Sequence, residues 1–91
     1  MRHNKRTHDP FSLVGALDTS RKALRLLEGN DCAPARRMAA KALLEARRAA
    51  GIPSRGVFNY GVASPMQQRA WDSIKANVRA VKRECPARRR R

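Results

Sequence analysis

This chain has few acidic residues, few aromatic residues and no long apolar segment. Its 91 residues include 7 Asp and Glu against 21 Lys and Arg, a formal net charge of +14, and only 4% of them are aromatic. No run of about 18 apolar residues is present, so we expect no membrane-spanning helix. Because 15 of the apolar residues are alanine, the single domain that this length allows has a small core, which predicts marginal stability or folding with a partner.

The sequence also shows no signal-peptide pattern, and it has only two cysteines. The first residues are charged, but they lack the apolar stretch of about 7–15 residues that a signal peptide needs. Cys32 and Cys85 are too few for a disulfide framework, and a chain that is not secreted keeps its thiols reduced. We therefore expect reduced cysteines and a cytoplasmic protein, in the host cytoplasm if the chain is phage-encoded.

Short boundary signals predict the first two helices. The Asp-Pro pair at residues 9–10 is typical of a helix start and Gly29 of a helix end, so the first helix is expected over residues 10–28. After a short turn, Asp31 is expected to cap a second helix over residues 32–50. A glycine and a proline just beyond residue 50 forbid its continuation.

The remaining signals predict a loop and a third helix. Residues 52–63 hold two glycines, a proline and β-prone side chains, which predict a structured loop with a short extended piece at residues 57–62. The capping-box sequence at residues 64–67, with its proline at the first helical position, predicts a third helix over residues 65–84.

Apolar side chains recur at helical spacing in each predicted helix. They predict an all-α, three-helix domain over residues 10–85, between a flexible basic arm at residues 1–9 and an Arg-rich tail at residues 86–91. The stripe of the second helix is mostly alanine, and small side chains let two helices approach closely. The stripes are Leu13, Leu17, Ser20, Leu24 and Leu27; Ala35, Met38, Ala39, Ala42, Leu43, Ala46 and Ala49; and Ala70, Trp71, Ile74, Val78 and Val81.

Basic side chains gather opposite the stripes of the second and third helices, where few acidic residues accompany them. Such a face is often only solvated, but an uncompensated field of one sign destabilises a compact state unless anions neutralise it. Phosphate backbones are suitable anions, because binding Lys and Arg releases their counterions. We therefore expect nucleic acid, DNA or RNA, to contact Arg37, Lys41 and Arg48 in the second helix and Lys75, Arg79, Lys82 and Arg83 in the third.

The loop and the tail offer further contacts. Arg55 is close in sequence to Phe58 and Tyr60, and a cation beside aromatic rings suits stacking on unpaired bases. The alternative is that both rings cover the open end of the helical bundle. The tail contributes a short phosphate-binding run of Arg88, Arg89, Arg90 and Arg91.

Other function classes have weaker support. The first two helices outline a helix-turn-helix, but Arg25 occupies a position where a tight helix crossing favours a small residue. His3 and His8 lie far from both cysteines without metal-ligand spacing, so we expect no metal or other cofactor. No histidine in the helical part lies beside a plausible nucleophile, and we expect no enzyme activity.

Two leucines do not fit the predicted core. Leu26 and Leu44 lie nearly opposite the apolar stripes of their own helices, so simple packing of the three helices leaves both exposed. A lone exposed leucine means little, but two on adjacent helices of a protein with a small core indicate a homodimer or a contact with a protein partner.

The sequence therefore predicts a small basic protein that binds nucleic acid through the phosphate backbone, using the second and third helices and both basic ends. The alternative belongs to a different class. It is a phage or mobile-element interaction protein that docks on an acidic surface of a host protein and inhibits or redirects it.

Overall fold

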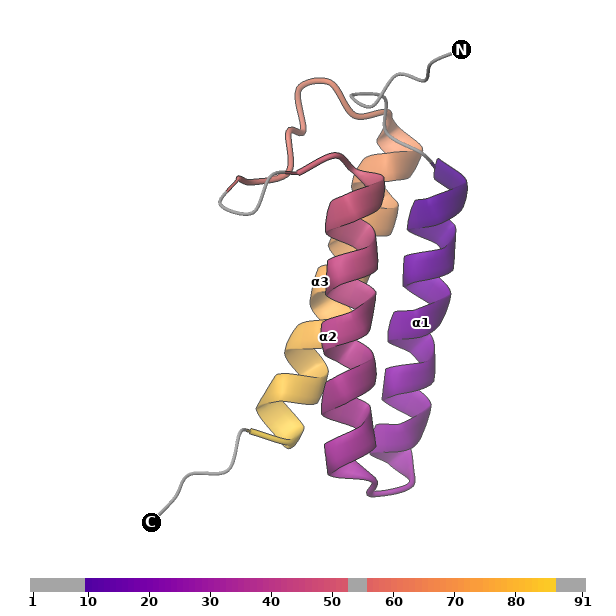
Figure 1. Cartoon of the computed structure of the whole chain (residues 1–91), viewed down its shortest axis with the longest axis vertical. Coiled ribbons are helices and arrows are strands. Elements are labelled where there is room, and N and C mark those ends of the chain that lie inside the picture. The colour runs from indigo at the N-terminus through magenta and orange to yellow at the C-terminus, as the bar shows by residue number, and fades with distance from the viewer. Residues whose placement is uncertain (1–9, 53–55, 87–91) are drawn as a thin grey trace.

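Three α-helices form a bundle whose neighbours in sequence run antiparallel (Figure 1). The computed structural model describes residues 10–52 and 56–86. The helices are α1 (Pro10–Glu28), α2 (Cys32–Ala49) and α3 (Pro65–Glu84), which confirms the all-α prediction with bounds within one residue of those expected. Of the helices in this part of the chain, none combines the length and apolarity needed to cross a membrane.

The pair α1 and α2 is an antiparallel hairpin (Figure 1). This arrangement differs from a helix-turn-helix, in which the two helices cross at about 90–120°. Helix α1 ends at Glu28, directly before Gly29 as expected, and Asn30, with a φ of 63°, takes the left-handed position of the turn. The Asn30 N–H donates to the Leu27 carbonyl at 2.9 Å and the Asp31 N–H to the Leu26 carbonyl at 2.9 Å, so carbonyls of the last helical turn are satisfied.

Alanine forms the buried face of α2. Its buried residues are Ala35, Ala39, Ala42 and Ala46, whereas the larger Met38 and Leu43 of the predicted stripe are only partly buried at its edges. The bulk of the core comes instead from the neighbouring helices. Among the side chains that the structure describes, Leu13 of α1 and Ile74 and Val81 of α3 are the large apolar ones that are fully buried.

A buried polar contact links α1 to α3. Ser20 is completely buried, its hydroxyl donates to the Leu17 carbonyl at 2.7 Å, and it accepts from the Asn77 side-chain amide at 3.0 Å. A buried hydroxyl without partners would cost about 1–3 kcal/mol. This pair therefore favours one register of α1 against α3.

Of the signals expected at the other helix ends, two are confirmed and one is wrong. Asp31 precedes α2, but its side chain makes no capping hydrogen bond, so its expected capping role is wrong. Gly51 has the left-handed φ of 71° that ends α2, as expected. The capping box of α3 is confirmed, because Ser64 N–H donates to Gln67 Oε1 at 2.8 Å and Gln67 N–H to Ser64 Oγ at 3.2 Å.

The segment before α3 has no strand within residues 56–64, so the expected extended piece is wrong. Asn59 turns the chain there, since its side-chain oxygen accepts from the Gly61 N–H at 3.0 Å and its carbonyl accepts from the Val62 N–H at 3.3 Å. Phe58 is buried and stacks on Trp71 with 4.7 Å between the ring centroids. This stack joins the loop to the first half of α3.

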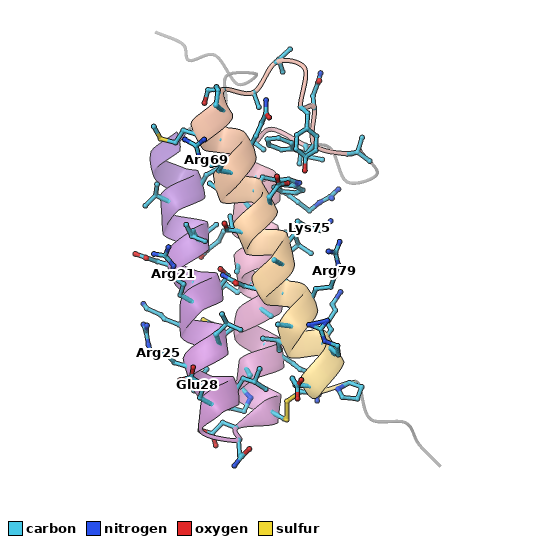
Figure 2. The ribbon with its side chains drawn as sticks, turned by 180° about the vertical axis from the view of Figure 1, so that it is seen from behind. Arg21, Arg25, Glu28, Arg69, Lys75 and Arg79 are labelled. Carbon is cyan, nitrogen blue, oxygen red and sulfur yellow. A yellow bond between two sulfur atoms is a disulfide. The ribbon has the colours of Figure 1, made fainter. Side chains whose placement is uncertain are left out.

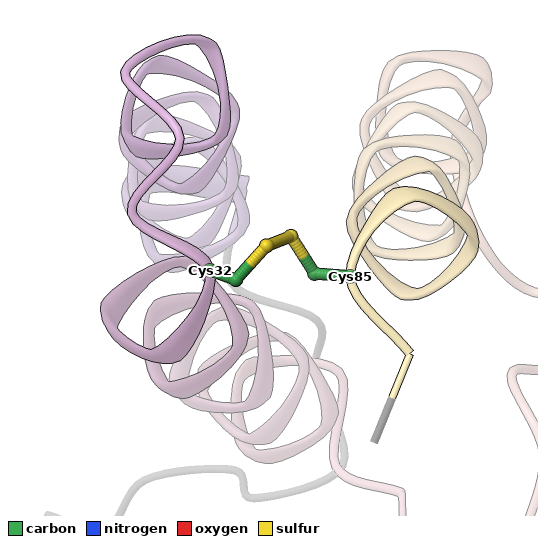
Figure 3. Close-up of a disulfide and its surroundings, with 2 residues drawn as sticks. All are labelled: Cys32 and Cys85. Carbon is green, nitrogen blue, oxygen red and sulfur yellow. A yellow bond between two sulfur atoms is a disulfide. The ribbon is translucent and has the colours of Figure 1, made fainter. Parts of the chain in front are cut away.

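A disulfide joins Cys32 to Cys85, which corrects the expectation of reduced thiols (Figure 3). Cys32 is the first residue of α2 and Cys85 directly follows α3. Because these helices run antiparallel, the two positions meet at one end of the bundle with their Cα atoms 5.5 Å apart, well within the range for a disulfide.

Reducing this bond is expected to lower the stability of the domain. It closes a loop with a sequence separation of 53, for which the chain-entropy relation gives about 4 kcal/mol. Urea unfolding followed by circular dichroism should therefore show a lower midpoint with a thiol reductant than without it. The double variant Cys32→Ala and Cys85→Ala should unfold near the reduced midpoint under both conditions. An unchanged wild-type midpoint would show that the bond contributes nothing.

Candidate nucleic-acid interface

The outer face of α2 carries the predicted basic strip. Arg37, Lys41 and Arg48 are all exposed, and their helical positions fall within about 40° of one another. The helix buries its alanines on the other side. The structure thus places all three cations in solvent on one face.

The α3 cations are less uniform. Arg79, Lys82 and Arg83 are exposed, as expected. Lys75 is partly buried, and its Nζ lies 5.6 Å from the ring centroid of Trp71. That distance is in the range of a cation–π interaction, so Lys75 also has a structural role at the core edge.

Cations lie on two separate edges of the bundle (Figure 2). Lys75 and Arg79 point away from α3 on the side opposite to α1, whereas Arg21 and Arg25 lie along the outer edge of α1. Asp18 forms an ion pair with Arg21 at 3.9 Å, so acid and base occur together on the α1 edge. The α1 edge is therefore a natural comparison for the α2 and α3 faces.

Two of the three acidic side chains of α2 and α3 have uncharged partners. Glu45 accepts a hydrogen bond from the Thr19 hydroxyl at 2.9 Å, and Asp72 accepts one from the Tyr60 hydroxyl. Within the part of the chain that the structure describes, no carboxylate lies within 4.0 Å of the charged nitrogens of the six exposed cations. These are Arg37, Lys41 and Arg48 of α2 and Arg79, Lys82 and Arg83 of α3.

A groove of about 630 Å³ separates the two basic faces. Its α2 wall consists of Arg36, Ala39, Ala40, Leu43, Leu44 and Arg47. Its α3 wall consists of Val78, Val81, Lys82, Cys85 and Pro86. The disulfide therefore lies at one end of this groove, which is apolar along its length and basic at its margins.

Sequence reasoning missed Arg36 and Arg47. Both are partly buried on the groove side of α2, and Arg47 Nη2 donates to the Gly56 carbonyl at 3.2 Å. Their separation of eleven residues is close to three helical turns, which places them on one side of the helix with Leu43. This spacing is the sequence signal that indicates the α2 wall.

Of the two loop aromatics, one is buried and one is exposed. Phe58 covers the end of the bundle, as the structural alternative expects. Tyr60 remains 46% exposed, with its ring edge-on to Phe58 at 4.8 Å and its hydroxyl hydrogen-bonded to Asp72. Its nucleic-acid contact stays a prediction. Arg55 lies outside the described residues.

The two unexpected leucines have different surroundings. Leu44 is 50% exposed, as predicted, and lines the groove. Leu26 is partly buried and packs against the core, so its predicted exposure is wrong. It lies in the last turn of α1, where the chain reverses into α2. The tail residues Arg88, Arg89, Arg90 and Arg91 lie outside the described part of the chain.

Neither a metal-binding cluster nor a similar protein helps to identify the functional site. Over residues 10–52 and 56–86, no three His, Cys, Asp or Glu side chains gather in a way that would hold a metal ion. Comparison with protein-family models, curated proteins and solved structures finds no match for this chain. The surface chemistry is therefore the basis for a functional proposal.

The Tyr60–Asp72 contact predicts an unusual titration. Donation of the hydroxyl proton to Asp72 raises the pKa of Tyr60, with desolvation and the Asp72 charge acting in the same direction. The stabilisation is fully present below the ordinary tyrosine pKa of about 10 and is lost as pH rises through the raised folded value. Tyr60 is the single tyrosine of the chain, so phenolate absorbance reports it alone. Asp72→Asn should lower its pKa, and identical curves for both proteins would contradict the contact.

Proposed function

We propose that this protein binds nucleic acid through the phosphate backbone, using the basic faces of α2 and α3 together with its basic ends. The observation that carries the proposal is the set of exposed α2 and α3 cations without a carboxylate partner in the described residues. Their charge is available to an external anion because α2 and α3 together carry ten basic side chains against three acidic ones, so the two helices do not balance their own charge.

The kind of cation supports phosphate as that anion. Of the 21 basic residues 16 are arginine, whose planar guanidinium donates two parallel hydrogen bonds to a phosphate group. Arg37 and Arg48 of α2 and Arg79 and Arg83 of α3 are all exposed. Both helices are folded elements, so they hold these four groups in fixed register along two adjoining faces.

The proposal concerns backbone binding without base readout. Contacts to phosphate position a protein on nucleic acid but carry no sequence information directly. Tyr60, a residue expected to stack on bases, already packs on Phe58 and bonds to Asp72. Since DNA and RNA share the phosphate backbone, the proposal covers both.

The cellular location of the protein stays a prediction. A cytoplasmic location and reduced cysteines were both expected of a chain that is not secreted, and the disulfide contradicts the second of these expectations. Disulfides persist mainly in oxidising compartments. Origin from a phage and a homodimer likewise remain predictions. Docking on an acidic host protein, the alternative to nucleic-acid binding, is favoured by one specific observation, the groove between α2 and α3.

The nucleic-acid proposal predicts a steep salt dependence. If the basic faces and ends neutralise about 6–10 phosphates, affinity for a duplex should fall about 10³–10⁵-fold between about 50 and 200 mM salt. Gel shift or fluorescence anisotropy with a labelled duplex and a labelled single strand measures this slope. Absence of binding at low salt, or an affinity that salt does not change, would contradict the proposal.

Charge-reversal variants distinguish binding by the proposed faces from attraction by the net charge alone. The pair Arg79→Glu and Arg83→Glu on α3 should reduce the slope of log affinity against log salt by about 2, because two phosphate contacts are lost. The matched control is Lys22→Glu and Arg25→Glu, two exposed cations of α1 with the same change in net charge. The control should change binding less. Equal losses would show that only net charge matters.

A further inference from the structure

The groove between α2 and α3 combines an apolar floor with an exposed apolar margin. Ala39, Val78 and Val81 line it and are buried, so its floor is part of the folded core. Leu44 stands at its α2 margin with half of its surface exposed, the most exposed leucine that the structure describes. A leucine beside a hollow apolar surface gains free energy when a second apolar surface covers both.

The charge at the rim limits what can cover it. Arg36 lines the α2 wall and Lys82 the α3 wall, and no acidic side chain is among the lining residues. An occupant therefore has apolar side chains toward the floor and acidic side chains toward both walls. A phosphate backbone supplies the acid groups but no aliphatic side chains, so the floor favours a protein over a nucleic acid.

The same charges argue against this chain as its own occupant. The arm at residues 1–9 is basic and the tail ends in four arginines, so either would bring cations against a cationic rim. A second copy would do so as well, because each chain carries a formal charge of +14. Complementarity points to an acidic segment of another protein.

The dimensions of the groove favour a helix. Along α2 it extends from Arg36 to Arg47, a rise of about 16 Å or three helical turns at about 1.5 Å per residue. An amphipathic helix with apolar residues at positions i, i+3, i+4 and i+7 presents a continuous apolar stripe over that length. Acidic residues beside the stripe then face Arg36 on one wall and Lys82 on the other.

We infer that the groove between α2 and α3 binds an amphipathic, acidic α-helix of a partner protein, which packs there as a fourth helix. Ala40, Leu43 and Leu44 contact its apolar stripe, and Arg36 and Lys82 pair with its acidic flanks. This binding site goes beyond the proposed nucleic-acid function and does not depend on it, since the exposed strip of α2 and the outer cations of α3 remain available for phosphate.

The test uses the oxidised full chain and a defined peptide. The probe is a fluorescein-labelled, end-capped peptide of about 18 residues, long enough for measurable helicity, with leucines on one helical face, glutamates on both flanks and alanine elsewhere. The control peptide has the same composition with leucines distributed around the helix. Anisotropy should show at least about tenfold tighter binding of the amphipathic peptide.

Two matched pairs of variants locate the binding site. Leu44→Gln should weaken peptide binding by about tenfold or more, whereas Val14→Gln, at a similarly exposed valine of α1, should not. Ala40→Glu places an acid in the groove and should weaken binding strongly. Ala76→Glu makes the same charge change at an exposed position of α3 that does not line the groove, and should have a small effect. All four positions are exposed, so circular dichroism should show the wild-type helix signal.

Several outcomes would overturn the inference. Equal affinities of the two peptides would mean that only charge attracts the peptide. Equal losses from Leu44→Gln and Val14→Gln would mean that the peptide does not bind in the groove. A salt-stable dimer that Leu44→Gln dissociates, together with no peptide binding, would make a second copy the occupant. An equal loss of duplex affinity in Leu44→Gln would assign the groove to nucleic acid. Duplex binding measured in parallel keeps failure of this inference distinct from failure of the nucleic-acid proposal.

Discussion

Two cationic helices, α2 and α3, have to be held side by side on a core that is largely alanine on the α2 side. Their mutual repulsion opposes the compact state, and the buried alanines of α2 supply little apolar area against it. The structure joins the two helices covalently at one end through Cys32 and Cys85. Near the other end, the Phe58 ring stacks on Trp71 and closes the loop over α3.

This arrangement explains why the surface field is not neutralised internally. Two acidic residues on the helices with the basic faces serve as hydrogen-bond acceptors that link parts of the fold. Glu45 joins α2 to α1 through Thr19, and Asp72 joins α3 to the loop through Tyr60. An acid in such a contact still contributes its charge, but it is positioned by a neutral partner and not by the exposed arginines. The outward-facing cations therefore attract external anions.

The groove and the basic strips are two consequences of one geometry. Small side chains on α2 let α1 lie against it, and the larger α3 residues pack toward the centre of the bundle. The opposite sides of α2 and α3 are left with a hollow between them. Arginines and lysines project from its rim and from the adjoining outer faces, so an apolar channel lies inside a basic surface. The proposed nucleic-acid contacts and the proposed helix site use mostly different residues of this surface.

The helices were predictable because their signals are local. The capping box at Ser64 and Gln67, the left-handed Gly51 and the apolar spacing of α3 act within a few residues of each other. The exposed cations of α2 followed from the same periodicity. Asn30 shows the limit of such signals, since it takes the left-handed position that the adjacent Gly29 also suits.

The sequence by itself determined three helices, their bounds and the basic faces, because helix formation depends on neighbours along the chain. Only the tertiary structure decided that Cys32 meets Cys85, that Leu26 is covered while Leu44 is exposed, and that Arg36 and Lys82 face one groove. Each of these outcomes depends on which ends and sides of separate helices are brought together. Helical periodicity specifies the sides of each helix, but the packing of all three helices determines which sides meet.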